Sequence, residues 1–356
     1  MTGERKLYPL KFVTESTEGG KYHLADLGYI DSISSNGWLG GNSLSDIMQT
    51  YLERVVGDIS FEFNGTQFPV MVKTLDVHGE LPLCVNPDDK VAEQRYDAFG
   101  KTALWYVAEA SDDALLYLGF EKVVSADLFY GSCLGGTVKG LLHKISPSKG
   151  DFFLIRPGTV YAASGKMTII EVSEASELVF RLEGGSPDEG TMLEEAFDII
   201  DFAPYDPSLR LHVGEKESPE TIVSLPQFTL SRIALSDPVK VSSENSDSYL
   251  LYVCISGAAA VQVTTPGSGG DEIFRLERGE VILIPAEVTD FHLVPTVSNT
   301  ILFEVRQDPR EEGLVLHGDA SDVEPAVGAL RRGEGRHFRV VDGRGAEAGR
   351  FCHRDS

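Results

Sequence analysis

This chain has little cysteine and no paired histidines. Its 356 residues include 4 Cys and 8 His. The cysteines at 84, 133, 254 and 352 lie far apart without a Cys-x-x-Cys motif, so we expect a reduced, cytoplasmic protein without a structural zinc cluster. The histidines form no His-x-His or His-x-x-x-His pair. No metal site built on paired histidines is therefore predicted.

The chain also has fewer positively than negatively charged residues. The chain has 31 Lys and Arg against 55 Asp and Glu, for a formal net charge of -24. This balance argues against nucleic acid or an anionic membrane as a partner. It would also repel a sugar phosphate, so any phosphate site must be a local basic pocket.

The sequence has no run of about 18 apolar residues, so no membrane span is expected. The N-terminus lacks the apolar segment of a signal peptide. Apolar residues make up 42% of the chain and charged residues 24%, which is typical of a globular protein. The length is sufficient for two ordinary domains.

Three segments have the pattern of helices. Between 44 and 56, apolar residues recur at helical spacing, with Ser43 and Asp46 as a capping pair and Gly57 as the C-terminal cap. A short helix is predicted over 88–98, after Pro87. A longer helical segment over 126–145 is expected to break at Gly135-Gly136.

Two runs of predicted strands contain the same turn. In the first run, Lys149-Gly-Asp151 is followed by Arg156-Pro-Gly158. In the second run, Arg278-Gly-Glu-Val-Ile-Leu-Ile-Pro-Ala286 repeats the Gly-x-x-x-x-x-Pro spacing. This repeat indicates an internal duplication of a β domain.

Four stretches carry a family resemblance. They are Phe68-Pro-Val-Met-Val-Lys-Thr-Leu-Asp76, Leu81-Pro-Leu-Cys-Val-Asn-Pro-Asp-Asp89, Gly100-Lys-Thr-Ala-Leu-Trp-Tyr-Val107 and Leu193-Glu-Glu-Ala-Phe-Asp-Ile-Ile-Asp-Phe202. Together they resemble the type I phosphomannose isomerases. These are zinc enzymes that interconvert mannose 6-phosphate and fructose 6-phosphate. The resemblance covers roughly residues 7 to 306.

The resemblance implies an all-β fold with helical insertions, built from two cupin jelly-roll barrels. Residues 1–185 would form the first barrel, which bears the site in the family, with a helical insert. Residues 186–219 would be a helical connecting segment, including a helix at 193–202. Residues 220–307 would form the second barrel. Residues 308–356 differ in composition and are expected to be a disordered tail.

The zinc ligands of the family are missing. Its Gln, His, Glu and second His correspond to Cys84, Asn86, Ala103 and Tyr161. Zinc prefers imidazole, thiolate or carboxylate ligands, and only Cys84 is a strong donor of that kind. We therefore expect no zinc and no other cofactor. The phenol of Tyr161 is expected to fill the volume left by zinc, with Asn86 as the partner of its hydroxyl.

Other positions of the family site are retained. Lys101 and Arg181 match family residues of the substrate pocket, Glu177 stands where the family has Asp, and Asp88 matches the Pro-Asp/Asn-Asp motif. The resemblance implies catalytic roles for Lys101, Arg181 and Glu177, and substrate binding by Lys101, Arg181 and Asp88. Alternatively, Lys101 and Arg181 are structural residues held in ion pairs by Glu177 or by the nearby Glu171.

Three functions remain open at this stage. The first is a metal-free, catalytically silent relative that binds a sugar or sugar phosphate. The second is an active aldose–ketose isomerase with rearranged ligands or a metal-free Lys/Arg mechanism. His78 and Glu80 could supply new ligands in principle, but a solvated position is the simpler expectation for both. The third is a protein-interaction module. The sequence does not set the oligomeric state.

Overall fold

The computed structural model describes residues 5–182, 193–212, 219–243, 246–264, 271–307 and 315–316. All of these described residues lie within one compact unit. Within the described ranges, no helix has the length and apolar character that a membrane span requires.

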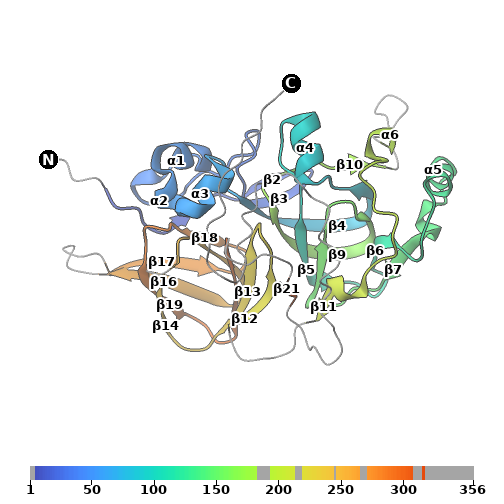
Figure 1. The fold of residues 1–356 in the computed structure, drawn as a ribbon. Coiled ribbons are helices and arrows are strands. Elements are labelled where there is room, and N and C mark those ends of the chain that lie inside the picture. Colours follow the sequence, from blue (N-terminus) through green and yellow to red (C-terminus); the bar gives the residue numbers. More distant parts are fainter. Residues whose placement is uncertain are drawn as a thin grey trace, which may run out of the picture. The chain divides into compact units, whose positions relative to one another are not determined.

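The first half of the chain is built on one large antiparallel sheet (Figure 1). Its central path runs β11-β8-β5-β9-β4-β3-β2, and β10, β6 and β7 join it at the side. The strands are β2 (Glu15–Thr17), β3 (Gly20–Leu24), β4 (Val70–Val85), β5 (Ala103–Ala110), β6 (Leu115–Phe120), β7 (Leu142–Ile145), β8 (Asp151–Ile155), β9 (Val160–Glu174), β10 (Phe180–Arg181) and β11 (Arg210–His212).

The second half has two antiparallel sheets. One has the order β1-β18-β15-β20-β13-β12-β21 and the other β14-β19-β16-β17. Their strands are β1 (Leu10–Lys11), β12 (Glu220–Ser224), β13 (Thr229–Leu235), β14 (Val239–Ser242), β15 (Leu250–Ser256), β16 (Ala258–Thr264), β17 (Asp271–Glu277), β18 (Val281–Ile284), β19 (Asp290–Pro295), β20 (Thr300–Arg306) and β21 (Val315–Leu316). Apolar side chains from both sheets share one core, as in a jelly roll.

Helices are short and occur between the strands. They are α1 (Leu44–Tyr51), α2 (Glu53–Val56), α3 (Asp58–Asn64), α4 (Asp89–Tyr96), α5 (Ala126–Leu134) and α6 (Leu193–Ala196), with 3-10 turns at Gly37–Leu39, Val138–Gly140 and Pro207–Leu209. The mostly β architecture with helical insertions confirms the predicted fold class.

The helix predicted over 44–56 is present but divided. Ser43 caps its start by accepting a hydrogen bond from the Asp46 backbone N–H at 3.1 Å, as predicted. The chain then breaks at Leu52, whose φ is +50°, and resumes as α2 before Gly57. The apolar spacing was therefore right, but it did not reveal the break.

Two other helix predictions were too long. The segment 126–145 is helical over Ala126–Leu134 and breaks at Gly135, as predicted. After a 3-10 turn at Val138–Gly140, however, its last part is strand β7. The helix predicted at 193–202 extends only over Leu193–Ala196. In both segments the apolar residues pack into one shared aromatic-rich cluster, so burial satisfies the pattern without a continuous helix.

The predicted domain boundaries stay a prediction. Two strand pairings cross them. Leu10–Lys11 pair with β18 of the second half. Val315–Leu316 lie inside the predicted tail, yet they pair with β12. The prediction of a tail outside the fold is wrong for these two residues. The rest of 308–356 lies outside the described residues.

Candidate functional site

Three neighbouring strands bring together the four positions that match the family's zinc ligands. The long strands β4 and β9 pair antiparallel, and their register places Cys84 opposite Tyr161. Strand β5 lies on the other side of β9 and begins at Ala103. Asn86 follows β4 directly. All four side chains are buried, so the frame predicted from the resemblance is present in the fold.

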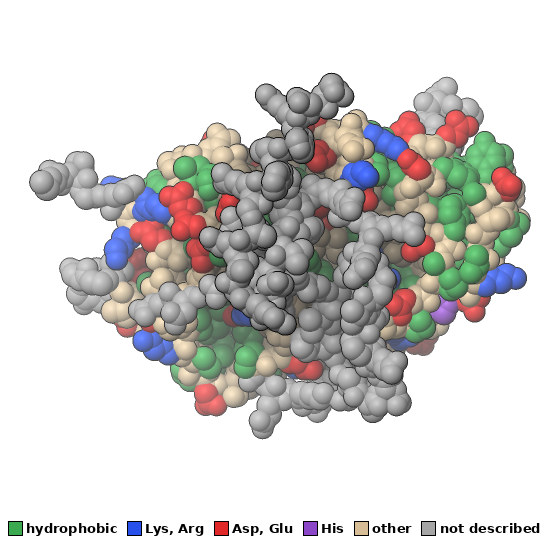
Figure 2. Space-filling view, in the orientation of Figure 1, with side chains coloured by type: hydrophobic (Ala, Val, Ile, Leu, Met, Phe, Trp, Pro, Cys, Tyr) green, Lys and Arg blue, Asp and Glu red, His purple; other side chains and the backbone are tan. Residues whose placement is uncertain are grey.

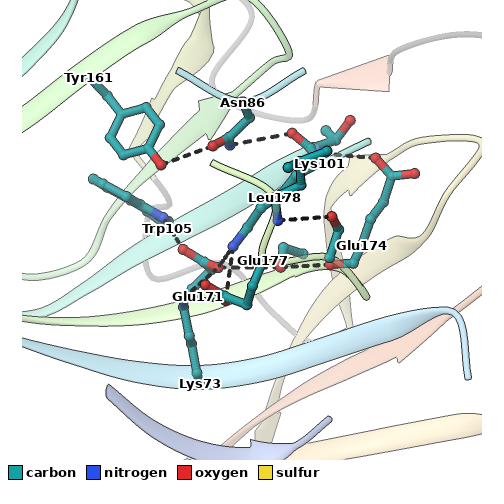
Figure 3. A network of polar contacts seen from close by, with 12 residues as sticks. Lys73, Asn86, Lys101, Trp105, Tyr161, Glu171, Glu174, Glu177 and Leu178 are labelled. Carbon is teal, nitrogen blue, oxygen red and sulfur yellow. Dashed lines mark hydrogen bonds and ion pairs between the residues drawn. The ribbon is translucent and has the colours of Figure 1, made fainter. Parts of the chain in front are cut away.

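An uncharged cluster occupies this place. We define the neutral cluster as Cys84, Asn86, Ala103, Trp105 and Tyr161. The Tyr161 hydroxyl donates a hydrogen bond to Asn86 Oδ1 at 2.9 Å, which confirms the predicted pairing (Figure 3). The indole of Trp105 packs edge-on against the phenol, with ring centroids 5.3 Å apart. The phenol thus fills this region and leaves its hydroxyl satisfied.

Burial keeps the neutral cluster protonated. It raises the pKa of Tyr161 well above its usual value, and the nearby Cys84 and Glu171 add to the rise. Burial also raises the pKa of the Cys84 thiol to about 11, although Arg181 and Lys101 oppose that shift. At neutral pH the cluster therefore presents a phenol and a thiol rather than anionic donors.

The residues at these positions do not fit zinc. Ala103 has no donor atom, the Tyr161 hydroxyl is bonded to Asn86, and Asn86 is a weak neutral donor. In the described ranges, no three His, Cys, Asp or Glu side chains are grouped so that they could hold a metal. His78 and Glu80 are exposed, and Glu80 pairs with Lys139 at 3.0 Å, so neither adds a ligand to the cluster.

A charged network lies next to the neutral cluster. We define the ionic network as Lys73, Lys101, Glu171 and Glu177. Lys101 Nζ lies 2.9 Å from Glu171 Oε1 and 3.1 Å from Glu177 Oε1. Lys73 Nζ lies 2.5 Å from Glu177 Oε1 and 3.6 Å from Glu171 Oε1. The network therefore balances two ammonium groups with two carboxylates.

Glu171 connects the two groups. Trp105 Nε1 donates to Glu171 Oε2 at 2.7 Å, and Ser173 donates to Oε1 at 3.3 Å. Burial alone would raise the pKa of Glu171, but Lys101 and Lys73 outweigh it and hold the pKa below the usual range. Figure 3 shows the connection from Tyr161 through Asn86 to the Lys101 backbone, whose side chain reaches the glutamates.

A tight loop positions Lys101. A Cβ on Gly100 would lie 2.4 Å from the Asp89 backbone nitrogen, so this position requires glycine. The Lys101 N–H then bonds to the Pro87 carbonyl at 3.1 Å. Asp88 caps α4 by accepting from the Val91 N–H at 2.8 Å. Its predicted role in substrate binding stays a prediction, and the structure adds this structural role.

The remaining predicted residues, Glu177 and Arg181, are more exposed, and we call the part of the surface that they form the rim. Glu177 is the most exposed member of the ionic network. Arg181 is exposed on β10, opposite Cys84, and has no ion-pair partner among the described residues. The alternative of a structural ion pair therefore applies to Lys101 but not to Arg181. Catalytic roles for Lys101, Glu177 and Arg181 stay predictions.

Sequence reasoning missed Lys73 and the contact of Trp105 with Glu171. Lys73 is buried in β4 between Val72 and Thr74, within a run of apolar residues. A lone lysine inside a buried apolar strand needs a nearby carboxylate. That signal was available, but the partner could not be found without the register of β4 and β9.

Both halves of the chain are built from antiparallel strands around apolar cores, and both contain the same turn. This architecture is that of the two-jelly-roll cupin class. A probable mannose-6-phosphate isomerase, GmuF of Bacillus subtilis, is 28% identical over 234 residues, covering 64% of this chain and 72% of that protein. The mannose-6-phosphate isomerase of Streptococcus mutans is 27% identical over 225 residues, covering 61% of this chain and 68% of that protein. These similarities agree with the resemblance that the sequence predicts. No protein-family model matches the chain.

Solved structures share the fold. The mannose 6-phosphate isomerase of Bacillus subtilis matches with a TM-score of 0.66 at 18% identity, covering 83% of this chain and 99% of that one. A zinc-bound mannose 6-phosphate isomerase matches with a TM-score of 0.66 at 13% identity, covering 84% and 99% of the two chains. At these identities the matches describe the fold alone.

Proposed function

We propose that this chain is a mannose-6-phosphate isomerase-like protein of carbohydrate metabolism that is catalytically silent as a zinc isomerase. In this proposal it still binds a sugar or sugar phosphate at the rim formed by Glu177 and Arg181. The family relationship supports the substrate class. The neutral cluster supports the loss of metal-dependent chemistry.

One observation carries this proposal. The Tyr161 hydroxyl donates to Asn86 at 2.9 Å where the family has two zinc-binding histidines. The cluster is satisfied without a cation, because its hydroxyl and amide are paired and Trp105 packs against the ring. A zinc ion entering here would have to displace a buried aromatic side chain and would meet only one strong donor.

Turnover of mannose 6-phosphate tests the proposal. In the family, zinc stabilises charge that develops on the substrate oxygens. Without that Lewis acid we expect a kcat at least about 10³-fold below a typical value of about 10 s⁻¹. The assay is run with added zinc and after treatment with a chelator. A rate within tenfold of the typical value would reject the silent-relative proposal.

The ionic network favours one alternative function. Glu177 is a carboxylate at the rim that could move a proton between neighbouring sugar carbons, and Arg181 could stabilise the developing enediolate. This metal-free isomerase would show turnover that is insensitive to chelators and lost in Glu177→Gln. Activity that depends on zinc would instead point to an isomerase with rearranged ligands.

A further inference from the structure

The charges at the rim bear on which class of sugar binds there. This inference rests on the proposed function, because it concerns the ligand of the same rim. The sequence resemblance implies substrate binding by Lys101 and Arg181, and two free cations in one pocket would suit a phosphate. In the structure the Lys101 side chain keeps only 3% of its surface exposed and lies between Glu171 and Glu177. Its charge is therefore already balanced inside the protein.

The second lysine does not change this balance. Lys73 contacts the same two carboxylates, and its ammonium also lies 5.5 Å from the ring centre of Tyr22. The ionic network thus has no net charge. Arg181 adds one positive charge at the exposed edge. A phosphate dianion at this rim would approach one arginine and also the carboxylate of Glu177.

Glu177 offers a free hydrogen-bond acceptor. Both lysines contact its Oε1 atom, at 2.5 and 3.1 Å. Its Oε2 atom has no partner among the described residues, and the side chain keeps 16% of its surface exposed. A carboxylate oxygen in this state accepts hydrogen bonds from hydroxyl groups and repels anions.

An exposed aromatic ring lies nearby. Tyr29 follows β3, between the bridged residues Asp26 and Asp31, and is 71% exposed. Partial burial of its phenol raises the Tyr29 pKa, the Glu177 carboxylate raises it further, and Lys101 lowers it. The next residue, Ile30, packs in one apolar cluster with Tyr22, and Lys73 Nζ of the ionic network lies 5.5 Å from the Tyr22 ring centre. The loop that carries Tyr29 therefore lies next to the network. An aromatic face beside a hydroxyl acceptor suits the mixed apolar and polar faces of a sugar ring.

We propose that the rim binds an uncharged sugar or polyol in preference to a phosphorylated one, with Glu177 Oε2 accepting sugar hydroxyls and the Tyr29 ring covering the apolar face. Arg181 contributes hydrogen bonds to neutral oxygens. Binding to such a partly solvated site is expected at millimolar affinity.

Calorimetry with mannose, fructose and mannose 6-phosphate tests this preference on the full chain. We expect the uncharged sugars to bind at least about fivefold more tightly than mannose 6-phosphate, with little change from about 50 to about 300 mM salt, because no net charge is neutralised. Mannose 6-phosphate binding more tightly than mannose, or no uncharged sugar binding below about 100 mM, overturns the proposal.

Variants localise the binding. Tyr29→Ala should weaken mannose binding at least about fivefold, whereas Tyr29→Phe retains it because the ring face remains. Ile273→Ala is the matched control, since Ile273 is an exposed apolar residue on β17 of the second half. Glu177→Gln should weaken mannose and strengthen mannose 6-phosphate, provided that its melting curve shows a folded protein. Unchanged mannose binding in Tyr29→Ala overturns the proposal.

The outcomes also separate this inference from the proposed function. A protein that lacks turnover and prefers sugar phosphate keeps the proposed function and loses the preference argued here. A protein that prefers uncharged sugars yet isomerises mannose 6-phosphate with zinc loses the proposed function instead.

Discussion

The two halves of this chain treat buried charge differently. The first half buries His23, Asp26, Lys73, Lys101, Asp151, Glu171 and Glu174. In the described part of the second half, the buried polar residues are serines, threonines and one glutamine. Both halves have extended apolar cores. Among the described residues, only the first half carries the costly buried charges that a site requires, even though the positions that match the family's zinc ligands do not fit zinc.

On the face shown in Figure 2, Asp and Glu side chains are distributed over many described elements. Lys73 and Lys101 of the first half are buried, so they do not contribute to the surface charge. Their ammonium groups instead contact Glu171 and Glu177 inside the site.

Removing one network charge should have the largest effect. Lys101→Met leaves Glu171 and Glu177 with one lysine between them, and breaking a buried pair typically costs about 3–5 kcal/mol. Chemical denaturation measures this loss. Lys240→Met is the control from the second half, where the pair with Asp290 is exposed, and it should cost less than about 1 kcal/mol. Equal losses would remove the distinction between the halves.

A second variant should partly restore the stability of Lys101→Met. Adding Glu177→Gln removes the carboxylate that Lys101 no longer balances, so the double variant should be more stable than Lys101→Met alone. If the two losses simply add, the network is not acting as a unit.

Asp26 should make stability depend on pH. Burial raises its pKa from 3.8 to about 6, although the Phe68 N–H lowers it by hydrogen bonding at 2.8 Å. The folded state therefore binds this proton more tightly than the unfolded state. The resulting stability is present in full below about pH 3.8 and is lost as the pH rises through about 6.

Asp26→Asn isolates this contribution. The amide can still accept from Phe68 but does not titrate. The free energy of unfolding of the parent minus that of Asp26→Asn should fall by roughly 2 kcal/mol between pH 4 and pH 7. A difference that stays flat over this range would show that Asp26 is not protonated in the fold.

Two buried tyrosines give the finest comparison. Tyr161 in the first half donates to Asn86, whereas the buried hydroxyl of Tyr249 in the second half has no partner among the described residues. Tyr161→Phe should destabilise by about 1–2 kcal/mol, because Asn86 Oδ1 loses its donor. Tyr249→Phe should be neutral or slightly stabilising. The reverse ranking in thermal melts would contradict the satisfied neutral cluster.

Much of the fold could be predicted from the sequence because the signals are local. The Ser43 cap and the short helix after Pro87 depend on neighbouring residues, and both are present. The continuous strands β4 and β9 were harder. Their glycines Gly79 and Gly165 lie opposite each other in one ladder. A glycine that bends a strand and one that ends it look alike in sequence.

The candidate site shows the same limit. The Tyr161–Asn86 pair could be predicted because the resemblance places both residues at one metal centre. The balance between Lys101 and the two glutamates could not, because it depends on the register that brings Lys73 opposite Glu171. Counting cations without this register overestimates the attraction for phosphate.

The zinc content of the purified protein tests the central claim most directly. Elemental analysis after dialysis against micromolar zinc should give well under one zinc per chain. The matched variant Cys84→Gln, Asn86→His, Ala103→Glu, Tyr161→His places the family ligands at the matching positions and should bind about one zinc per chain. Near-stoichiometric zinc in the parent, lost in Cys84→Ala, would contradict the account.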